Sequence, residues 1–136
     1  MSRALIIEDT NSDLRQSAGV VKKLGFKDVD AVNNVAGALM ILQDGVDGNK
    51  PLPDLVLLDL SFTQESGFEV LRYWKSNKES MKGTRIVVWT VMGDTEQQLC
   101  RYFGVDVVSK HAGPDELERA LRPHTSPRSQ GASLEQ

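Results

Sequence analysis

The sequence predicts an α/β protein built on a doubly wound, five-stranded parallel sheet, the flavodoxin-like (βα)5 arrangement with strand order 2-1-3-4-5. Five short runs rich in branched aliphatic residues alternate strictly with five segments whose apolar residues recur at helical spacing. The 136 residues suffice for one domain with a sizeable core. Strict alternation places helices on both faces of a parallel sheet, and right-handed crossovers then favour this winding.

The first two strand-helix units cover residues 4–45. The run ALIIED (4–9) precedes TNSDLRQSAGVVKKLGF, which has a Thr/Asn/Ser cap region at its start and Gly25 near its end. The run KDVDAV (27–32) alternates like a short strand near an edge. The helical segment NVAGALMILQDG follows it, and Gly45 is a plausible stop for that helix.

The other three strand-helix units begin at residue 53. The stretch PDLVLLDLS (53–61) holds four consecutive aliphatic residues, which predicts a strand buried on both faces. The runs TRIVVWT (84–90) and VDVVSK (105–110) are the fourth and fifth strands. Three helical segments follow these strands in turn: FEVLRYWKSN, DTEQQLCRYFG and GPDELERALRP, the last with Pro114 in its first turn.

We expect the domain to occupy residues 1–123. Residues 124–136 lose the periodicity and collect Ser, Pro and Gln, which predicts a disordered tail or the start of a linker.

Composition excludes several classes of function. A net charge of -3 without a basic stripe argues against nucleic-acid binding by this domain. The amino terminus lacks the pattern of a secretory signal, and no apolar run approaches the length of a membrane span, so we expect a cytoplasmic protein without membrane contact. The single cysteine, Cys100, excludes an internal disulfide framework and is expected to be a small buried hydrophobe.

Acidic, hydroxyl and amine side chains lie at the ends of four predicted strands. These residues are Glu8, Asp9, Asp59, Thr90 and Lys110. Each alone could be structural, as a helix cap, a turn residue or a solvated charge. Because ligands collect at the carboxyl ends of the strands in such sheets, their joint placement favours one functional site.

Three clustered carboxylates repel one another unless a cation lies among them. Mg²⁺ suits the position, because it prefers oxygen ligands and is commonly held by one or two carboxylates together with phosphate oxygens. A carboxylate can itself be a nucleophile that forms an aspartyl phosphate. Lys110 and the Thr90 hydroxyl could then neutralise charge on the transferred group.

The order Glu8-Asp9, Asp59, Thr90 and Lys110, each closing a strand, resembles the receiver domain of two-component response regulators over about residues 3–123. The resemblance implies that Asp59 accepts a phosphoryl group from a sensor histidine kinase or a phosphotransfer protein of a phosphorelay. Such a domain catalyses only its own phosphorylation and dephosphorylation, and it signals by contact with a downstream protein.

The same resemblance assigns further roles. Asp9 would bind Mg²⁺ directly, Glu8 would help through water or hydrogen bonds, and Asp59 and the backbone carbonyl of Ser61 would be further ligands. Thr90 would donate a hydrogen bond to a phosphoryl oxygen, and Lys110 would pair with Asp59 or its phosphate. Gly67 matches the family's glycine at the start of the third helix.

Four positions depart from the family pattern. Val107 replaces the aromatic residue whose rotation usually reports phosphorylation, and His111 replaces the proline after the lysine, so we expect a trans peptide there. Val91 stands where a small residue usually follows the threonine, and Thr63 replaces a common proline. These changes leave the predicted phosphorylation chemistry intact and concern the output step.

Two other functions are compatible with part of this pattern. A pseudo-receiver would have the fold and bind partners without phosphorylation. A haloacid-dehalogenase-like phosphatase also uses a strand-end aspartate, but it needs a second acid where this chain has Ser61. Among the remaining candidates, we interpret His111 as solvated and Trp74 and Phe103 as core residues.

Overall fold

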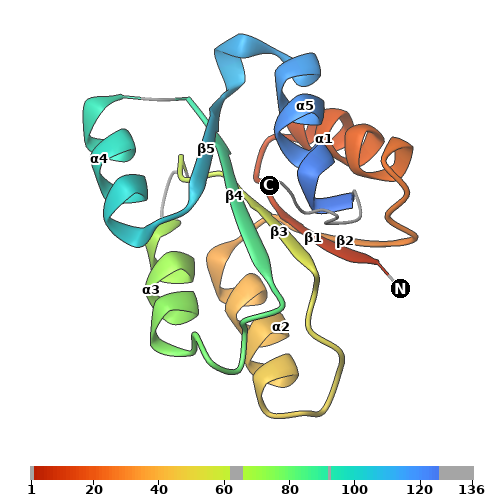
Figure 1. Cartoon of the computed structure of the whole chain (residues 1–136), viewed down its shortest axis with the longest axis vertical. Helices are drawn as coiled ribbons and strands as arrows, with labels where there is room; N and C mark the ends of the chain where they lie inside the picture. The colour runs from red at the N-terminus through yellow and green to blue at the C-terminus, as the bar shows by residue number, and fades with distance from the viewer. Residues whose placement is uncertain (1, 62–65, 92, 126–136) are drawn as a thin grey trace, which may run out of the picture.

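The computed structural model describes residues 2–61, 66–91 and 93–125, and within them strands alternate with helices as predicted (Figure 1). The strands are β1 Arg3–Ile7, β2 Asp28–Val32, β3 Leu55–Leu58, β4 Arg85–Thr90 and β5 Asp106–Ser109. The helices are α1 Asn11–Lys23, α2 Val35–Val46, α3 Phe68–Ser76, α4 Asp94–Phe103 and α5 Pro114–Thr125, and a short 3-10 helix, η1 Lys110–Ala112, precedes α5.

The five strands form one parallel sheet in the order β2-β1-β3-β4-β5, which confirms the predicted fold. Ile7 at the end of β1 lies opposite Leu58 of β3, and Leu58 lies opposite Val88 of β4. Thr90, the last residue of β4, lies opposite Ser109 of β5. This register brings the carboxyl ends of β1, β3, β4 and β5 to one edge of the sheet.

The helices cover both faces of the sheet (Figure 1). Helices α2, α3 and α4 pack on one face around a first core that includes Leu42, Leu71 and Cys100. Helices α1 and α5 pack on the other face around a second core that includes Val21 and Leu117. Each buried aliphatic side chain contributes roughly 1.5–3 kcal/mol relative to an exposed one, so the two cores stabilise the sheet from both sides.

The expected core residues take the predicted places. Cys100 is fully buried, and burial raises the pKa of its thiol to about 11, with a further contribution from the charge of Glu96. Phe103 is buried in the first core, and Trp74 packs against that core as a partly buried residue.

Several element boundaries differ from the prediction by one residue or more. Gly45 lies inside α2 rather than stopping it, and a Cβ there would lie 2.5 Å from a methyl carbon of Leu52, so close packing explains the glycine. Lys110 starts η1 rather than ending β5, and α5 continues past position 123 to Thr125. Residues 126–136 of the expected tail lie outside the described residues.

Within the described ranges, no helix is long and apolar enough to cross a membrane. None of the described peptide bonds is cis, so the bond from Lys110 to His111 is trans, as expected.

Candidate functional site

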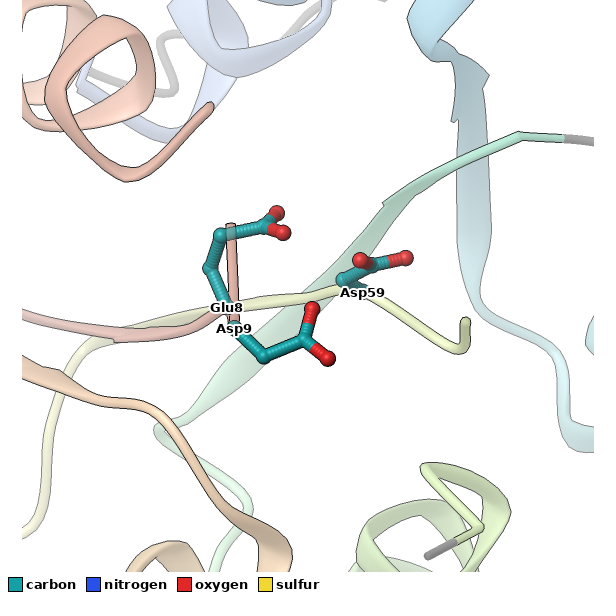
Figure 2. Close-up of side chains that lie close together, drawn as sticks. All are labelled: Glu8, Asp9 and Asp59. Atoms are coloured by element: carbon teal, nitrogen blue, oxygen red, sulfur yellow. The ribbon is translucent and has the colours of Figure 1, made fainter. Parts of the chain in front are cut away.

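Three predicted carboxylates meet at the carboxyl edge of the sheet and form the acid cluster, Glu8, Asp9 and Asp59 (Figure 2). Glu8 and Asp9 follow β1, and Asp59 follows β3. One oxygen from each residue lies within 4.8 Å of the others. Glu8 and Asp59 are buried, each about 3% exposed, whereas Asp9 is exposed. The acid cluster therefore combines two buried carboxylates with one that is accessible to solvent.

Asp59 is held by donors on both carboxylate oxygens. Its Oδ1 accepts hydrogen bonds from the Ser61 backbone N–H at 3.0 Å and from the Thr90 hydroxyl at 2.8 Å. Its Oδ2 accepts from Lys110 Nζ at 3.1 Å. Burial alone would raise the pKa of Asp59, but the bonds from Ser61 and Thr90 and the neighbouring Lys110 charge outweigh burial and lower it. Asp59 is thus an ionised carboxylate at neutral pH.

Lys110 contacts three carboxylates at once. Its Nζ lies 2.9 Å from Glu8 Oε1, 2.7 Å from Asp13 Oδ2 and 3.1 Å from Asp59 Oδ2. Burial would lower the pKa of Lys110, but the hydrogen bonds to Asp13 and Glu8 and the charge of Asp59 raise it well above its usual value. The ammonium therefore stays charged across the physiological range.

Glu8 has the opposite electrostatic balance to Asp59. Burial, together with the nearby Asp59 charge, raises the pKa of Glu8 to about 7 in spite of the contact with Lys110. Its Oε2 also accepts a hydrogen bond from the Thr10 backbone N–H at 3.3 Å. Two buried acids on neighbouring strands thus hold their protons with very different affinity.

The acid cluster fits a hard divalent cation. Its donors are all carboxylate oxygens, which Mg²⁺ and Mn²⁺ prefer. When all three acids are ionised, Lys110 balances only one of the three negative charges. Glu8, Asp9 and Asp59 are the residues that would hold such an ion.

Two contacts were missed from the sequence. Asp13, in the first turn of α1, reaches Lys110 across 97 positions of sequence. The Ser61 hydroxyl lies 3.0 Å from the Thr90 hydroxyl, although the family resemblance implied a role only for the Ser61 carbonyl. The position of Asp13 in the helix after β1, whose amino end lies at the carboxyl edge of the sheet, was the available signal.

The structure also places the remaining predicted positions. Gly67 is the residue before α3, and a Cβ there would lie 2.8 Å from the Asp59 backbone oxygen, so the glycine lets α3 start beside the acid cluster. Val91 follows β4 and is 50% exposed, Val107 packs partly buried against the first core, and His111 is exposed as expected. Thr63 lies outside the described residues.

Comparison with known proteins identifies the class. Residues 4–122 match the response regulator receiver domain family, and the chain belongs to that family of two-component signalling proteins. Its five-stranded sheet with the order 2-1-3-4-5 is the receiver fold.

Individual relatives are more distant. The chain is 24% identical over 118 residues to the chemotaxis protein CheV1 of Helicobacter pylori, covering 87% of this chain and 36% of CheV1. It is 29% identical over 100 residues to the response regulator Rcp1 of Synechocystis, covering 72% of this chain and 67% of Rcp1. The Mn²⁺-bound structure of Rcp1 superposes with a TM-score of 0.71 at 25% identity, covering 90% of this chain and 91% of that one.

Proposed function

We propose that this chain is a receiver that accepts a phosphoryl group on Asp59 in a Mg²⁺-dependent reaction and passes the signal on by protein contact in the cytoplasm. The donor would be a sensor histidine kinase or a phosphotransfer protein. One observation supports this most strongly: Asp59 is a buried, ionised carboxylate with Thr90 and Lys110 at hydrogen-bonding distance.

The proposed reaction forms one bond and breaks one. An Asp59 carboxylate oxygen attacks phosphorus, and the bond from phosphorus to the donor's nitrogen or oxygen breaks, with its electron pair leaving on the donor. Lys110 and the Thr90 hydroxyl then donate hydrogen bonds to phosphoryl oxygens. The acid cluster and the Ser61 backbone carbonyl would hold a Mg²⁺ ion, which would supply charge neutralisation for the transferred group.

The donors of the acid cluster and one related structure support the binding of a divalent cation. The acid cluster has suitable donors, and the related Rcp1 has been solved with Mn²⁺ bound. We assign Mg²⁺ as the ion, with Asp9 as a direct ligand and Glu8 assisting.

Intact mass spectrometry after incubation with Mg²⁺ and acetyl phosphate tests this function. We expect one base-labile phosphate on the wild type, none on Asp59→Asn, and strongly reduced labelling of Asp9→Ala. The matched control is Asp30→Asn, which removes an exposed acid on β2 and should label like the wild type. Label that persists in Asp59→Asn would place the chemistry on another residue.

The same experiment separates the alternatives. A pseudo-receiver, which the replacement of the switch aromatic by Val107 favours, would remain unlabelled while still binding partners. A haloacid-dehalogenase-like phosphatase would hydrolyse added phosphate esters with turnover. Ser61, which occupies the place of that family's second acid, bonds Thr90 and offers no carboxylate for such a reaction.

A further inference from the structure

We infer that Asp13 is a positioning residue for Lys110, and that its carboxylate keeps the ammonium at the reacting centre when a metal ion and a phosphoryl group occupy the site. The inference rests on the proposed function. It begins from the 2.7 Å distance between Asp13 Oδ2 and Lys110 Nζ, the shortest of the three contacts that Lys110 makes with carboxylates.

Asp13 stands apart from the acid cluster. Its oxygens do not belong to the group that could hold a metal ion, and its side chain is 30% exposed whereas those of Glu8 and Asp59 are almost fully buried. It is carried by α1, whereas Lys110 is carried by η1 after β5. The contact therefore joins the helix that follows β1 to the turn that precedes α5.

Lys110 and a divalent cation would compete for the same carboxylates, so Lys110 needs a further contact outside the acid cluster. The ammonium of Lys110 has three donors, and Glu8, Asp13 and Asp59 take one each. Two of these acids, Glu8 and Asp59, are also members of the acid cluster, so a divalent cation would draw on the same two carboxylates. Asp13 is the partner that Lys110 does not share with the metal group.

Without the contact to Asp13, the side chain of Lys110 would be free to move. Lysine has a flexible four-carbon stem and gains little from a single exposed contact. With Asp13 in place, the ammonium is bonded to a residue of α1, and it also lies 5.2 Å from the centroid of the Trp89 indole ring. Its third donor is then aimed at Asp59, where a phosphoryl oxygen would arrive.

The test compares Asp13→Asn with the wild type at saturating Mg²⁺, using acetyl phosphate and intact mass. We expect the labelling rate to fall about three- to tenfold, because the charge-assisted contact that orients Lys110 is weakened, and Asp13→Glu to recover most of it. Removing a negative charge would by itself favour an anionic donor, so slower labelling has the opposite sign to a general charge effect. The matched control is Asp115→Asn in the first turn of α5, which should label at least as fast as the wild type.

A second measurement follows Lys110 at saturating Mg²⁺, with beryllofluoride in place of a phosphodonor so that the site is occupied. In a Trp74→Phe background, Trp89 is the sole tryptophan, and the ammonium near its ring perturbs its emission. We expect the emission spectrum of Asp13→Asn to move toward that of Lys110→Met, and the spectrum of Asp115→Asn to match the wild type.

The outcomes distinguish the two proposals. A wild type that labels while Asp13→Asn labels equally fast, or an Asp13→Asn emission spectrum identical to the wild type, overturns the role of Asp13 and leaves the proposed function standing. A wild type that takes no phosphate at all overturns the proposed function first, and with it the task assigned to Asp13.

Discussion

Burial of Glu8 makes the metal-free protein less stable as the pH rises. The ordinary pKa of 4.5 rises to about 7 in the folded chain, so between these values the folded state keeps a proton that the unfolded state has lost. This contribution to stability is fully present below pH 4.5 and is lost as the pH rises through 7. A difference of this size corresponds to about 3 kcal/mol in the free energy of unfolding.

Glu8→Gln isolates this effect, because glutamine resembles the protonated acid and does not titrate. We expect the free energy of unfolding of Glu8→Gln, relative to the wild type, to increase by about 2 to 3 kcal/mol between pH 5 and pH 8. Urea denaturation in EDTA at several pH values gives the difference directly. The lowered pKa of Asp59 contributes stability that is fully present above pH 3.8, the ordinary value. That contribution is lost only as the pH falls below 3.8, so it does not change between pH 5 and pH 8.

Titrating groups other than Glu8 cancel in the comparison of the two proteins. Glu79→Gln is the control, since it makes the same substitution at a side chain that is 91% exposed. Parallel pH profiles for wild type and Glu8→Gln would refute the reasoning and mean that Glu8 is ionised throughout, held by Lys110.

Three further predictions concern residues around Asp59. Gly67→Ala should destabilise the protein by about 1 to 3 kcal/mol and slow labelling, because its Cβ would lie 2.8 Å from the Asp59 backbone oxygen; wild-type stability in urea would contradict this. Val91, which is 50% exposed, is expected to narrow the approach to phosphorus, so Val91→Ala should speed both labelling by acetyl phosphate and spontaneous dephosphorylation, with a stability change of no more than about 1 kcal/mol; two unchanged rates would exclude such a gate. Beryllofluoride with Mg²⁺ should shift amide signals beside Asp59 and Thr90 more than those of α4, β5 and α5, because Val107 cannot make the rotation of an aromatic side chain; equal shifts on that outer face would reveal another transmitting element.

Much of this protein follows from local sequence. The alternation of aliphatic runs with helical spacing predicts the parallel sheet, and the four buried residues of β3 read directly as a central strand. Parallel strands end at a common edge of the sheet. The five residues at these ends could therefore be assigned to one site without any measured contact: Glu8, Asp9, Asp59, Thr90 and Lys110. The spacing of apolar residues is a local property, so it can be recognised along the sequence.

Other features depend on how the elements pack. Gly45 reads as a helix stop in sequence, yet the approach of Leu52 explains it. The sequence places Asp13 near the start of the helix after β1, but it does not specify the contact with Lys110 or the difference in pKa between Glu8 and Asp59. These depend on the depth of each side chain and on the placement of α1 beside η1. Sequence by itself therefore determined the fold and the residues that meet at the edge of the sheet, whereas the tertiary structure decided their partners and charges, since burial and contact distance arise only when distant segments pack together.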